Sequence, residues 1–308
     1  MKKVVKYLLA AGAAALTCFG AALKSVPACT TAASASDAVA EFSMVGEYLS
    51  LDGKFALQAT LLPDQTFLTA QYRGGLPGDG WDQSPIISST KTAGELKTKL
   101  KGFQRVERQS PTLGKPQPAD AILRFPEDFT QVKNGIMRAG AKTRKNIGSF
   151  HMHLEFMIPF KPARNLSNQD RGNSGIYIFN NYEIQILDSF ALDFNHPENN
   201  ANKIESSNMQ WCGALYKTKT PDLNMTYPPL CWQTYDIDFK APIFAGDKKV
   251  KNARITVRHN GVLIHDDVEL KNGTGNGAKK RQLSEGPVFF QNHGNPVQFR
   301  NVWASELK

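Results

Sequence analysis

One short segment places an acid and an amide where they could act on a bound ligand. Residues 182–186 read Tyr-Glu-Ile-Gln-Ile, and this alternation of polar and β-branched side chains predicts a strand. Because the side chains of a strand point alternately to its two faces, Glu183 and Gln185 project together while the two isoleucines enter a core. A carboxylate and an amide on one face can bind hydroxyl groups and move a proton, so this strand is the first candidate for a ligand cleft.

A glycine-bracketed polar turn leads into this strand. Residues 171–175 read Arg-Gly-Asn-Ser-Gly, so Arg171 and Asn173 are candidate hydrogen-bonding groups beside Glu183. Asn173 also has a structural explanation, because asparagine tolerates the left-handed backbone conformation of tight turns. We therefore expect this turn to line a cleft, with backbone geometry as the alternative reason for its composition.

Three further segments carry candidate groups. The turn His-Gly-Asn-Pro at 293–296 supplies His293, whose imidazole can act as acid or base near neutral pH or can simply cap backbone groups. Asp188 is a second carboxylate just beyond the strand. Arg300 and Trp211 are candidates for hydrogen bonding to a ligand and for stacking on it. An ion pair on the strand surface for the arginine and a core position for the tryptophan are the competing explanations.

Short alternating strands fill the rest of the chain. Examples are residues 150–158, residues 233–239 and the hairpin 254–265, whose Asn260-Gly261 turn is typical of type I′. No long stretch of helical period follows the first 28 residues. Many short strands over about 190 residues predict an all-β fold, a jelly-roll β-sandwich.

Composition divides the chain into five parts. The section before the proline-rich stretch alternates like a β-structure but is too short for a large core of its own, so we expect a small β-rich module there. The expected parts are a signal peptide at 1–28, a small-residue linker at 29–42, the β-rich module at 43–109, a Pro-rich linker at 110–118 and the jelly-roll domain at 119–308.

The first residues predict export. Three lysines precede an apolar run that ends at Leu23, and Val-Pro-Ala at 26–28 suits signal peptidase. The run is rich in alanine and glycine, and this weak hydrophobicity argues against a retained membrane span. Cys29 directly follows and could instead carry a lipid, which would be the protein's one link to a membrane.

The charge balance gives no sign of a nucleic-acid partner. The formal net charge is +9, and removal of residues 1–28 takes away four lysines and no acids, which leaves about +5. The remaining positive charges are scattered, apart from patches at 142–145 and 279–281. Neither patch is interleaved with the aromatic side chains that stack on bases, so we expect no nucleic-acid binding.

Neither the cysteines nor the histidines carry a clear metal signature, and we expect no metal and no other cofactor. Cys212 and Cys231 either form a disulfide worth roughly 3 kcal/mol in an oxidising compartment or remain free buried thiols. His151, His153 and Glu155 share one face of a strand and could gather a divalent ion. A polar outer face of the sheet is the favoured explanation for that pattern.

Five blocks together resemble one family. They are Gly-Asn-Ser-Gly-Ile at 172–176, Tyr-Glu-Ile-Gln-Ile-Leu-Asp-Ser at 182–189, Cys-Gly-Ala-Leu-Tyr at 212–216, Trp-Gln-Thr-Tyr-Asp-Ile at 232–237 and His-Gly-Asn-Pro-Val-Gln-Phe-Arg-Asn at 293–301. In this order they resemble the 3-keto-disaccharide hydrolase family over roughly residues 119–308. The resemblance implies a concanavalin A-like jelly roll that acts on oxidised disaccharides or glycosides in the periplasm of a Gram-negative bacterium. In one departure, Asn292 precedes His293 where members often carry an aspartate.

The residues argue against a conventional glycosidase. Such an enzyme needs two carboxylates, about 5–5.5 Å apart for retention or about 6.5–9.5 Å apart for inversion. Gln185, which cannot titrate, occupies the place of a second acid on the Glu183 strand. Asp188 would reach the same face only if a bulge intervened.

A 3-keto sugar, the substrate class that the resemblance implies, allows an elimination followed by hydration. Its ketone acidifies the hydrogen on C2, and the glycosidic oxygen on C1 can leave after a base has removed that proton. We expect Glu183 or His293 to be the base and the other to assist the leaving group, with Asp188 as the remaining catalytic candidate. The expected substrate-binding residues are Asn173, Gln185, Arg171, Arg300 and Trp211.

Two other functions are consistent with the same residues. A lectin-like sandwich can bind carbohydrate without catalysis, and it can also carry a conventional hydrolase for unoxidised sugars, because a fold does not determine a function. Product release from a sugar separates the first from an enzyme, and cleavage of an unoxidised sugar identifies the second.

Overall fold

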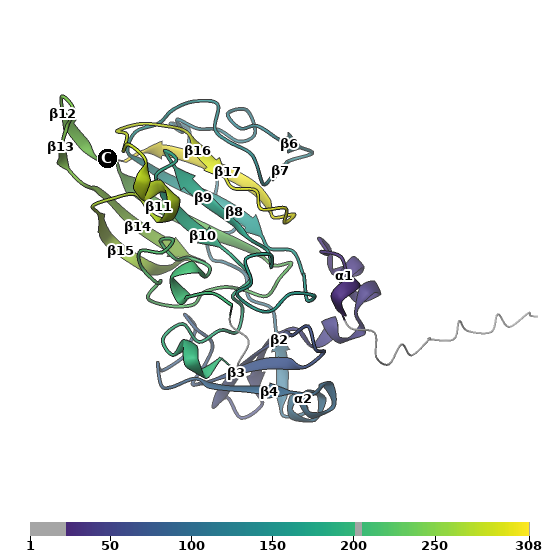
Figure 1. The fold of residues 1–308 in the computed structure, drawn as a ribbon. Helices are drawn as coiled ribbons and strands as arrows, with labels where there is room; N and C mark the ends of the chain where they lie inside the picture. The colour runs from purple at the N-terminus through teal and green to yellow at the C-terminus, as the bar shows by residue number, and fades with distance from the viewer. Residues whose placement is uncertain (1–22, 201–204, 308) are drawn as a thin grey trace, which may run out of the picture.

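The structure is a computed structural model that describes residues 23–200 and 205–307. The expected signal peptide lies, up to residue 22, outside the described residues. Within the described ranges, no helix is long and apolar enough to cross a membrane. Figure 1 shows a large β-sandwich packed against a smaller sheet formed by the N-terminal part of the chain.

The smaller sheet is a five-stranded antiparallel module with the strand order β4-β3-β2-β1-β5. A helix, α2, crosses between its last two strands. This helix was not predicted from the sequence, although Thr92 and Glu95 form the reciprocal capping box that marks a helix start. The elements are β1 (Gly46–Ser50), β2 (Phe55–Leu61), β3 (Phe67–Arg73), β4 (Ile87–Lys91), α2 (Ala93–Leu100) and β5 (Phe103–Val106).

The segment expected as a linker, residues 29–42, is ordered and packed. It contains the helix α1 (Ala32–Ala38) and most of the 3-10 turn η2 (Ala40–Met44), and a short turn η1 (Leu23–Ser25) precedes it. Cys29 exchanges backbone hydrogen bonds of 2.9 and 3.0 Å with Phe160 of the sandwich. Small apolar side chains of this segment are buried in the same core cluster as the module, which explains why it does not behave as a free linker.

The larger domain consists of two antiparallel sheets. The seven-stranded sheet has the order β15-β14-β11-β8-β17-β7-β6 and the three-stranded sheet the order β10-β9-β16, while β12 and β13 form a separate hairpin. The strands are β6 (Val132–Lys133), β7 (Ile136–Arg138), β8 (Phe150–Met157), β9 (Ser174–Ile178), β10 (Tyr182–Ile186), β11 (Trp232–Lys240), β12 (Ile243–Ala245), β13 (Lys248–Lys251), β14 (Ala253–His259), β15 (Val262–Leu270), β16 (Val288–Phe290) and β17 (Gln298–Glu306). Short 3-10 turns are η3 (Pro197–Asn199), η4 (Asn208–Gln210) and η5 (Gly275–Lys279).

The core lies between these two sheets and follows the alternation of the strands. Every second side chain of β8 and β11 enters it, and Ile184 and Ile186 enter from β10. The turn between β14 and β15 has positive φ at both central residues, 50° at Asn260 and 78° at Gly261, as the type I′ prediction requires. The predicted jelly-roll β-sandwich with a small β-rich module before it is therefore confirmed.

Cys212 and Cys231 are free thiols, so the disulfide considered for them does not form. The Sγ atom of Cys212 lies 3.2 Å from the Tyr235 hydroxyl inside the core. Burial raises the pKa of Cys231 to about 11, and Glu47 and Glu107 of the N-terminal module add to the rise. The two side chains thus face different surroundings, one inside the sandwich and one toward the module.

Candidate active site

A cleft of about 230 Å³ lies on the outer face of the three-stranded sheet. Glu183 and Gln185 point into it from β10, opposite to the core-facing isoleucines, as the alternation predicted. Tyr177 joins them from β9, where it is the register partner of Glu183. Loops and the 3-10 turn η5 supply the remaining lining residues, which are Gln169, Asn173, Tyr216, Asn276, Gln291 and His293.

Hydrogen bonds hold the histidine loop against the polar turn that precedes β9. The backbone nitrogen of Gln291 donates to the carbonyl of Gly175 at 2.8 Å, and the Ser174 hydroxyl donates to the carbonyl of Gln291 at 2.7 Å. The side-chain oxygen of Asn295 accepts from the backbone nitrogen of Gly172 at 3.1 Å. These bonds bring together two motifs that are more than 110 residues apart in the chain.

Gly175 leaves the space that the Glu183 carboxyl group occupies. A Cβ atom at position 175 would lie 2.6 Å from Oε1 of Glu183, closer than real Cβ contacts. Gly175 pairs with Gln185 across the strands, so the longer side chain of Glu183 leans along the sheet over the glycine. A side chain at this position would therefore displace the Glu183 carboxylate from where it stands.

Burial raises the pKa of Glu183 to about 7, and the Tyr177 hydroxyl and the charge of Lys217 oppose this rise only in part. Only 2% of the residue is exposed. A carboxyl group with a pKa near neutrality is populated in both protonation states at physiological pH. Glu183 can therefore take a proton from a ligand and return it, which an ordinary surface glutamate does poorly.

Four buried polar atoms around the cleft have no hydrogen-bond partner within the described structure. Three are acceptors, namely Glu183 Oε2, Gln185 Oε1 and Gln291 Oε1, and one is a donor, Gln169 Nε2. Buried polar atoms are nearly always paired, because an unpaired one costs about 1–3 kcal/mol. These four atoms are therefore available to hydrogen-bond a polar ligand in the cleft.

Asn173 belongs to the same ring of amides. Its side-chain nitrogen donates to Gln169 Oε1 at 3.3 Å, and its oxygen accepts from Gln185 Nε2 at 3.4 Å. Both contacts are long, so the three amides are oriented toward one another without being tightly engaged. Each of these amides can thus turn to a ligand at little cost.

The structure does not bring Asp188 or Arg171 to the cleft. Both are fully buried and form an ion pair with 2.7 Å between Arg171 Nε and Asp188 Oδ2. The guanidinium also donates to the carbonyl of Leu61 in the module at 3.1 Å. Asp188 stands past the end of β10, where the chain leaves the sheet, and this pair links the two parts of the protein instead of meeting a ligand.

Trp211 and Arg300 also lie elsewhere. Trp211 is buried in a separate apolar cluster, with its ring 4.9 Å from that of Phe194. Arg300 lies on the outer face of the seven-stranded sheet, where its Nε is 2.7 Å from Glu155 and its guanidinium covers the Trp232 ring. Trp211 thus occupies a core position and Arg300 forms an ion pair, which are the structural explanations considered for these two residues.

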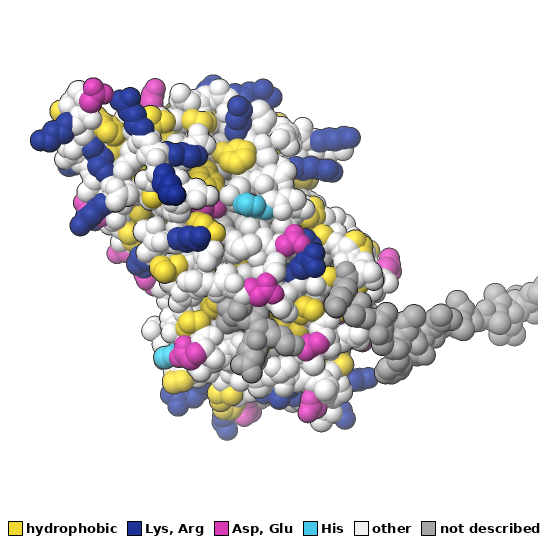
Figure 2. Space-filling view, viewed as in Figure 1, with side chains coloured by type: hydrophobic (Ala, Val, Ile, Leu, Met, Phe, Trp, Pro, Cys, Tyr) yellow, Lys and Arg dark blue, Asp and Glu magenta, His cyan; other side chains and the backbone are white. Residues whose placement is uncertain are grey.

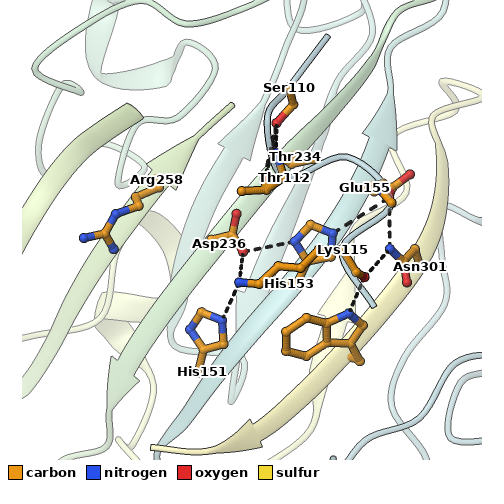
Figure 3. A network of polar contacts seen from close by, with 12 residues as sticks. Ser110, Thr112, Lys115, His151, His153, Glu155, Thr234, Asp236, Arg258 and Asn301 are labelled. Atoms are coloured by element: carbon orange, nitrogen blue, oxygen red, sulfur yellow. Dashed lines mark hydrogen bonds and ion pairs between the residues drawn. The ribbon is translucent and has the colours of Figure 1, made fainter. Parts of the chain in front are cut away.

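The histidine-rich face of β8 binds the Pro-rich segment, which we call the strap (residues 110–118). Figure 3 shows Lys115 of the strap between His151 and Asp236, and its Nζ lies 3.0 Å from the Asp236 carboxylate. The Gly114 backbone nitrogen donates to Glu155 at 2.6 Å. Within residues 23–200 and 205–307, no group of three His, Cys, Asp or Glu side chains is placed to hold a metal ion. This polar face therefore anchors a segment of the chain and is not an open, solvated surface.

Five lining residues of the cleft were not predicted from the sequence. Tyr177 shares its strand face with Gly175, and Tyr216 ends one of the five blocks. The sequence therefore contained an indication for both tyrosines. Gln291 stands beside the noted departure at Asn292, but Asn292 itself faces away from the cleft. Gln169 and Asn276 come from loops without a recognisable pattern.

Replacing Gly175 with alanine is expected to lower kcat/KM about 10- to 100-fold, because the new methyl group displaces the Glu183 carboxylate from its position. The measurement is steady-state turnover of the substrate proposed below. Gly148→Ala is the matched control, since a Cβ there meets no atom closer than 3.8 Å. An unchanged kcat/KM in Gly175→Ala would contradict the requirement for this space.

One family model matches the chain. It is described as the 3-keto-alpha-glucoside-1,2-lyase-like domain and matches residues 97–305, which begins within α2, earlier than the resemblance suggested. Three proposed glycosyl hydrolases from Parabacteroides distasonis are among the similar solved structures, with 27%, 18% and 19% sequence identity. The similarity covers 62%, 58% and 60% of this chain and 85%, 83% and 92% of theirs, with TM-scores of 0.49, 0.41 and 0.37. No curated protein matches the chain.

Proposed function

The chain belongs to the 3-keto-alpha-glucoside-1,2-lyase-like family and is a carbohydrate hydrolase-like protein, and we propose that it cleaves the glycosidic bond of 3-keto-disaccharides and 3-keto-glycosides. The observation that carries this proposal is the single acid of the cleft. Among the described lining residues, Glu183 alone has a carboxyl group, and its pKa is about 7. One base with that pKa suits an elimination next to a ketone.

The reaction begins at C2 of the keto sugar. Glu183 removes the C2 proton, and the electrons of the C–H bond form an enolate across C2 and C3. When the ketone forms again, these electrons make a C1=C2 double bond and the C1–oxygen bond breaks. The glycosidic oxygen then leaves with its electron pair and needs a proton.

In this proposal His293 supplies that proton. It is exposed at the rim of the cleft, whereas Glu183 is buried at its floor, so the ring sits where a leaving group departs. Water then adds across C1=C2, with its hydroxyl bonding to C1 and its proton passing to His293. Glu183 returns its proton to C2, which regenerates both residues and completes a net hydrolysis.

The amides supply binding and electrostatic stabilisation. Gln185, Gln291 and Gln169 carry the unpartnered atoms, and Asn173 links them. Sugar hydroxyls can donate to the free oxygens, and amide nitrogens can donate to the enolate oxygen as its charge develops. Such donors are worth more in a buried site than in water.

The competing functions lack this support. A conventional glycosidase requires a second carboxylate at a defined distance from Glu183, and the described lining contains none. A nucleic-acid partner is also disfavoured, because on the face shown in Figure 2 the Lys and Arg side chains are scattered and form no continuous stripe. A lectin-like module would need the same hydroxyl-binding amides but would not need a carboxyl group with a pKa near 7.

The test is product release from 3-keto-trehalose and from trehalose, measured side by side with the same protein preparation. We expect cleavage of the keto sugar alone. Cleavage of both sugars would contradict the one-base mechanism and indicate a conventional glycosidase. Binding of either sugar without cleavage would establish a lectin-like module instead.

We also propose that the protein is exported to the periplasm through cleavage after residue 28. The lysines and apolar run of the first residues support export. The Cys29 thiol is buried 3.5 Å from the carbonyl of Ser34, which disfavours a lipid on its sulfur. The mass of the mature protein should be that of residues 29–308, and an added lipid mass would contradict this proposal.

A further inference from the structure

The loop that carries His293 separates two spaces. Gln291 and His293 line the catalytic cleft, whereas Asn292 and the residues from Gly294 onward line a second hollow of about 430 Å³. Lining residues of the two spaces alternate along this loop, so the same short segment borders both. The second hollow, which we call the outer hollow, is lined by Thr30, Arg138, Ala139, Asn292, Gly294, Asn295, Pro296, Val297 and Gln298.

The catalytic cleft is too small for a whole disaccharide. Its volume of about 230 Å³ is below the roughly 300–1,000 Å³ of most small-molecule pockets, so it holds about one sugar ring. The Glu183 carboxylate at its floor requires that this ring be the oxidised one. The second ring of a disaccharide must then lie beyond the rim, on the side where His293 stands.

The lining of the outer hollow suits a neutral sugar ring. Gln298, Asn292 and Thr30 offer hydrogen-bonding groups, and the side chains of Pro296 and Ala139 offer an apolar surface for C–H groups. This mixture of a few polar groups on an apolar wall is typical of ligand sites.

Arg138 is the charged residue of this lining. Its side chain is exposed, and no described residue forms an ion pair or side-chain hydrogen bond with it. A guanidinium carries five donors in a fixed plane, which can reach several hydroxyl groups of one ring. The absence of an acidic partner leaves all of these donors available to a ligand.

The loop between the two spaces is held rigidly. The Asn295 side chain is 2% exposed, and it accepts from Gly172 and from Lys161 while donating to the carbonyl of His293 at 3.2 Å. Thr30 forms another side of the outer hollow, and the backbone pairing of Cys29 with Phe160 fixes Thr30 beside the sandwich. The contacts of Asn295 fix the loop that stands between the two spaces.

We propose that the outer hollow is the subsite for the leaving group and that it takes a neutral sugar or another polyhydroxy aglycone. This inference rests on the proposed function. It gives the protein a preference for 3-keto-disaccharides over 3-keto-glycosides with small aglycones, and this preference arises outside the catalytic cleft.

The test compares 3-keto-trehalose with methyl 3-keto-α-glucoside, whose aglycone is too small to occupy the outer hollow. Arg138→Ala removes the guanidinium, and Thr30→Trp fills the space from a position outside the sheets. Each variant is expected to raise KM for 3-keto-trehalose at least about fivefold and to leave kcat/KM for the methyl glycoside within about twofold. Arg144→Ala is the matched control, since this arginine is also exposed and has no side-chain partner among residues 23–200 and 205–307, but does not line the hollow.

The outcomes separate the subsite from the reaction. Equal effects of Arg138→Ala and Thr30→Trp on both substrates, or no effect on either, would overturn the subsite while the cleavage activity stands. Failure of the wild-type protein to cleave the methyl glycoside and the keto-disaccharide would instead overturn the proposed function, and the subsite with it.

Discussion

Glu183→Gln is expected to lower kcat/KM for a 3-keto-glycoside by at least about a thousandfold, because the amide cannot accept the C2 proton. General-base catalysis contributes about 10²- to 10⁴-fold, and here the base is the one carboxyl group among the described lining residues. The substitution keeps the size of the side chain, so binding through the surrounding amides should persist. Turnover of 3-keto-trehalose under single-turnover conditions is the measurement.

The pH dependence gives the same residue a second signature. With a pKa of about 7, the free enzyme holds Glu183 as the acid below neutrality and as the base above it. The kcat/KM of the wild type should therefore rise with pH through about 7. The residual kcat/KM of Glu183→Gln should not show this rise.

Stability provides the control for this substitution. Since burial disfavours the ionised carboxylate, the neutral amide should leave the melting temperature at pH 8 unchanged or slightly raise it. Glu127→Gln changes an exposed acid and should alter neither activity nor stability. Activity of Glu183→Gln within tenfold of the wild type would remove Glu183 from the role of base.

Asp188→Asn is expected to destabilise the protein by about 3–5 kcal/mol, because it leaves the Arg171 guanidinium buried without its counter-charge. A loss of this size lowers the melting temperature by roughly 10 °C in a chain of this length. The bond from Arg171 to the Leu61 carbonyl means that contact between the module and the sandwich should weaken as well. Thermal and urea unfolding measure both effects.

A neighbouring ion pair supplies the matched control. Asp170 pairs with Lys161 and Arg164 but has 43% of its side chain exposed, so Asp170→Asn should cost less than about 1 kcal/mol. At temperatures well below unfolding, kcat/KM of Asp188→Asn should still rise with pH through about 7, as in the wild type. A large fall in kcat with an unchanged melting temperature would return Asp188 to the catalytic residues.

The candidate site was predictable where it depended on one strand. The alternation in residues 182–186 placed Glu183 and Gln185 together, and the structure keeps them on one face. Asn173 and His293 came from turns whose composition marked them as candidates, and long-range hydrogen bonds bring both to the same cleft. Tyr177 was missed although its register with Glu183 follows from the hairpin that joins β9 and β10.

Other candidate residues lie outside the cleft, because the type of a residue does not indicate which partner it will meet when it is buried. Arg171 and Asp188 stand next to the correct motifs, but they use their charges on each other. Arg300 pairs with Glu155, which lies on a strand 145 residues away in the chain. Neither pairing has a local sequence signal.

By itself the sequence determined the local geometry: which side chains share a strand face, which turns need a positive φ, and which blocks mark the family. Only the tertiary structure decided what covers each polar face. The strands β8 and β10 alternate in the same way, yet the strap covers the outer face of β8, whereas the outer face of β10 stays open as the cleft around Glu183. The physical reason is that a period of two residues sets the direction of side chains, whereas the cover over them comes from distant segments through long-range packing.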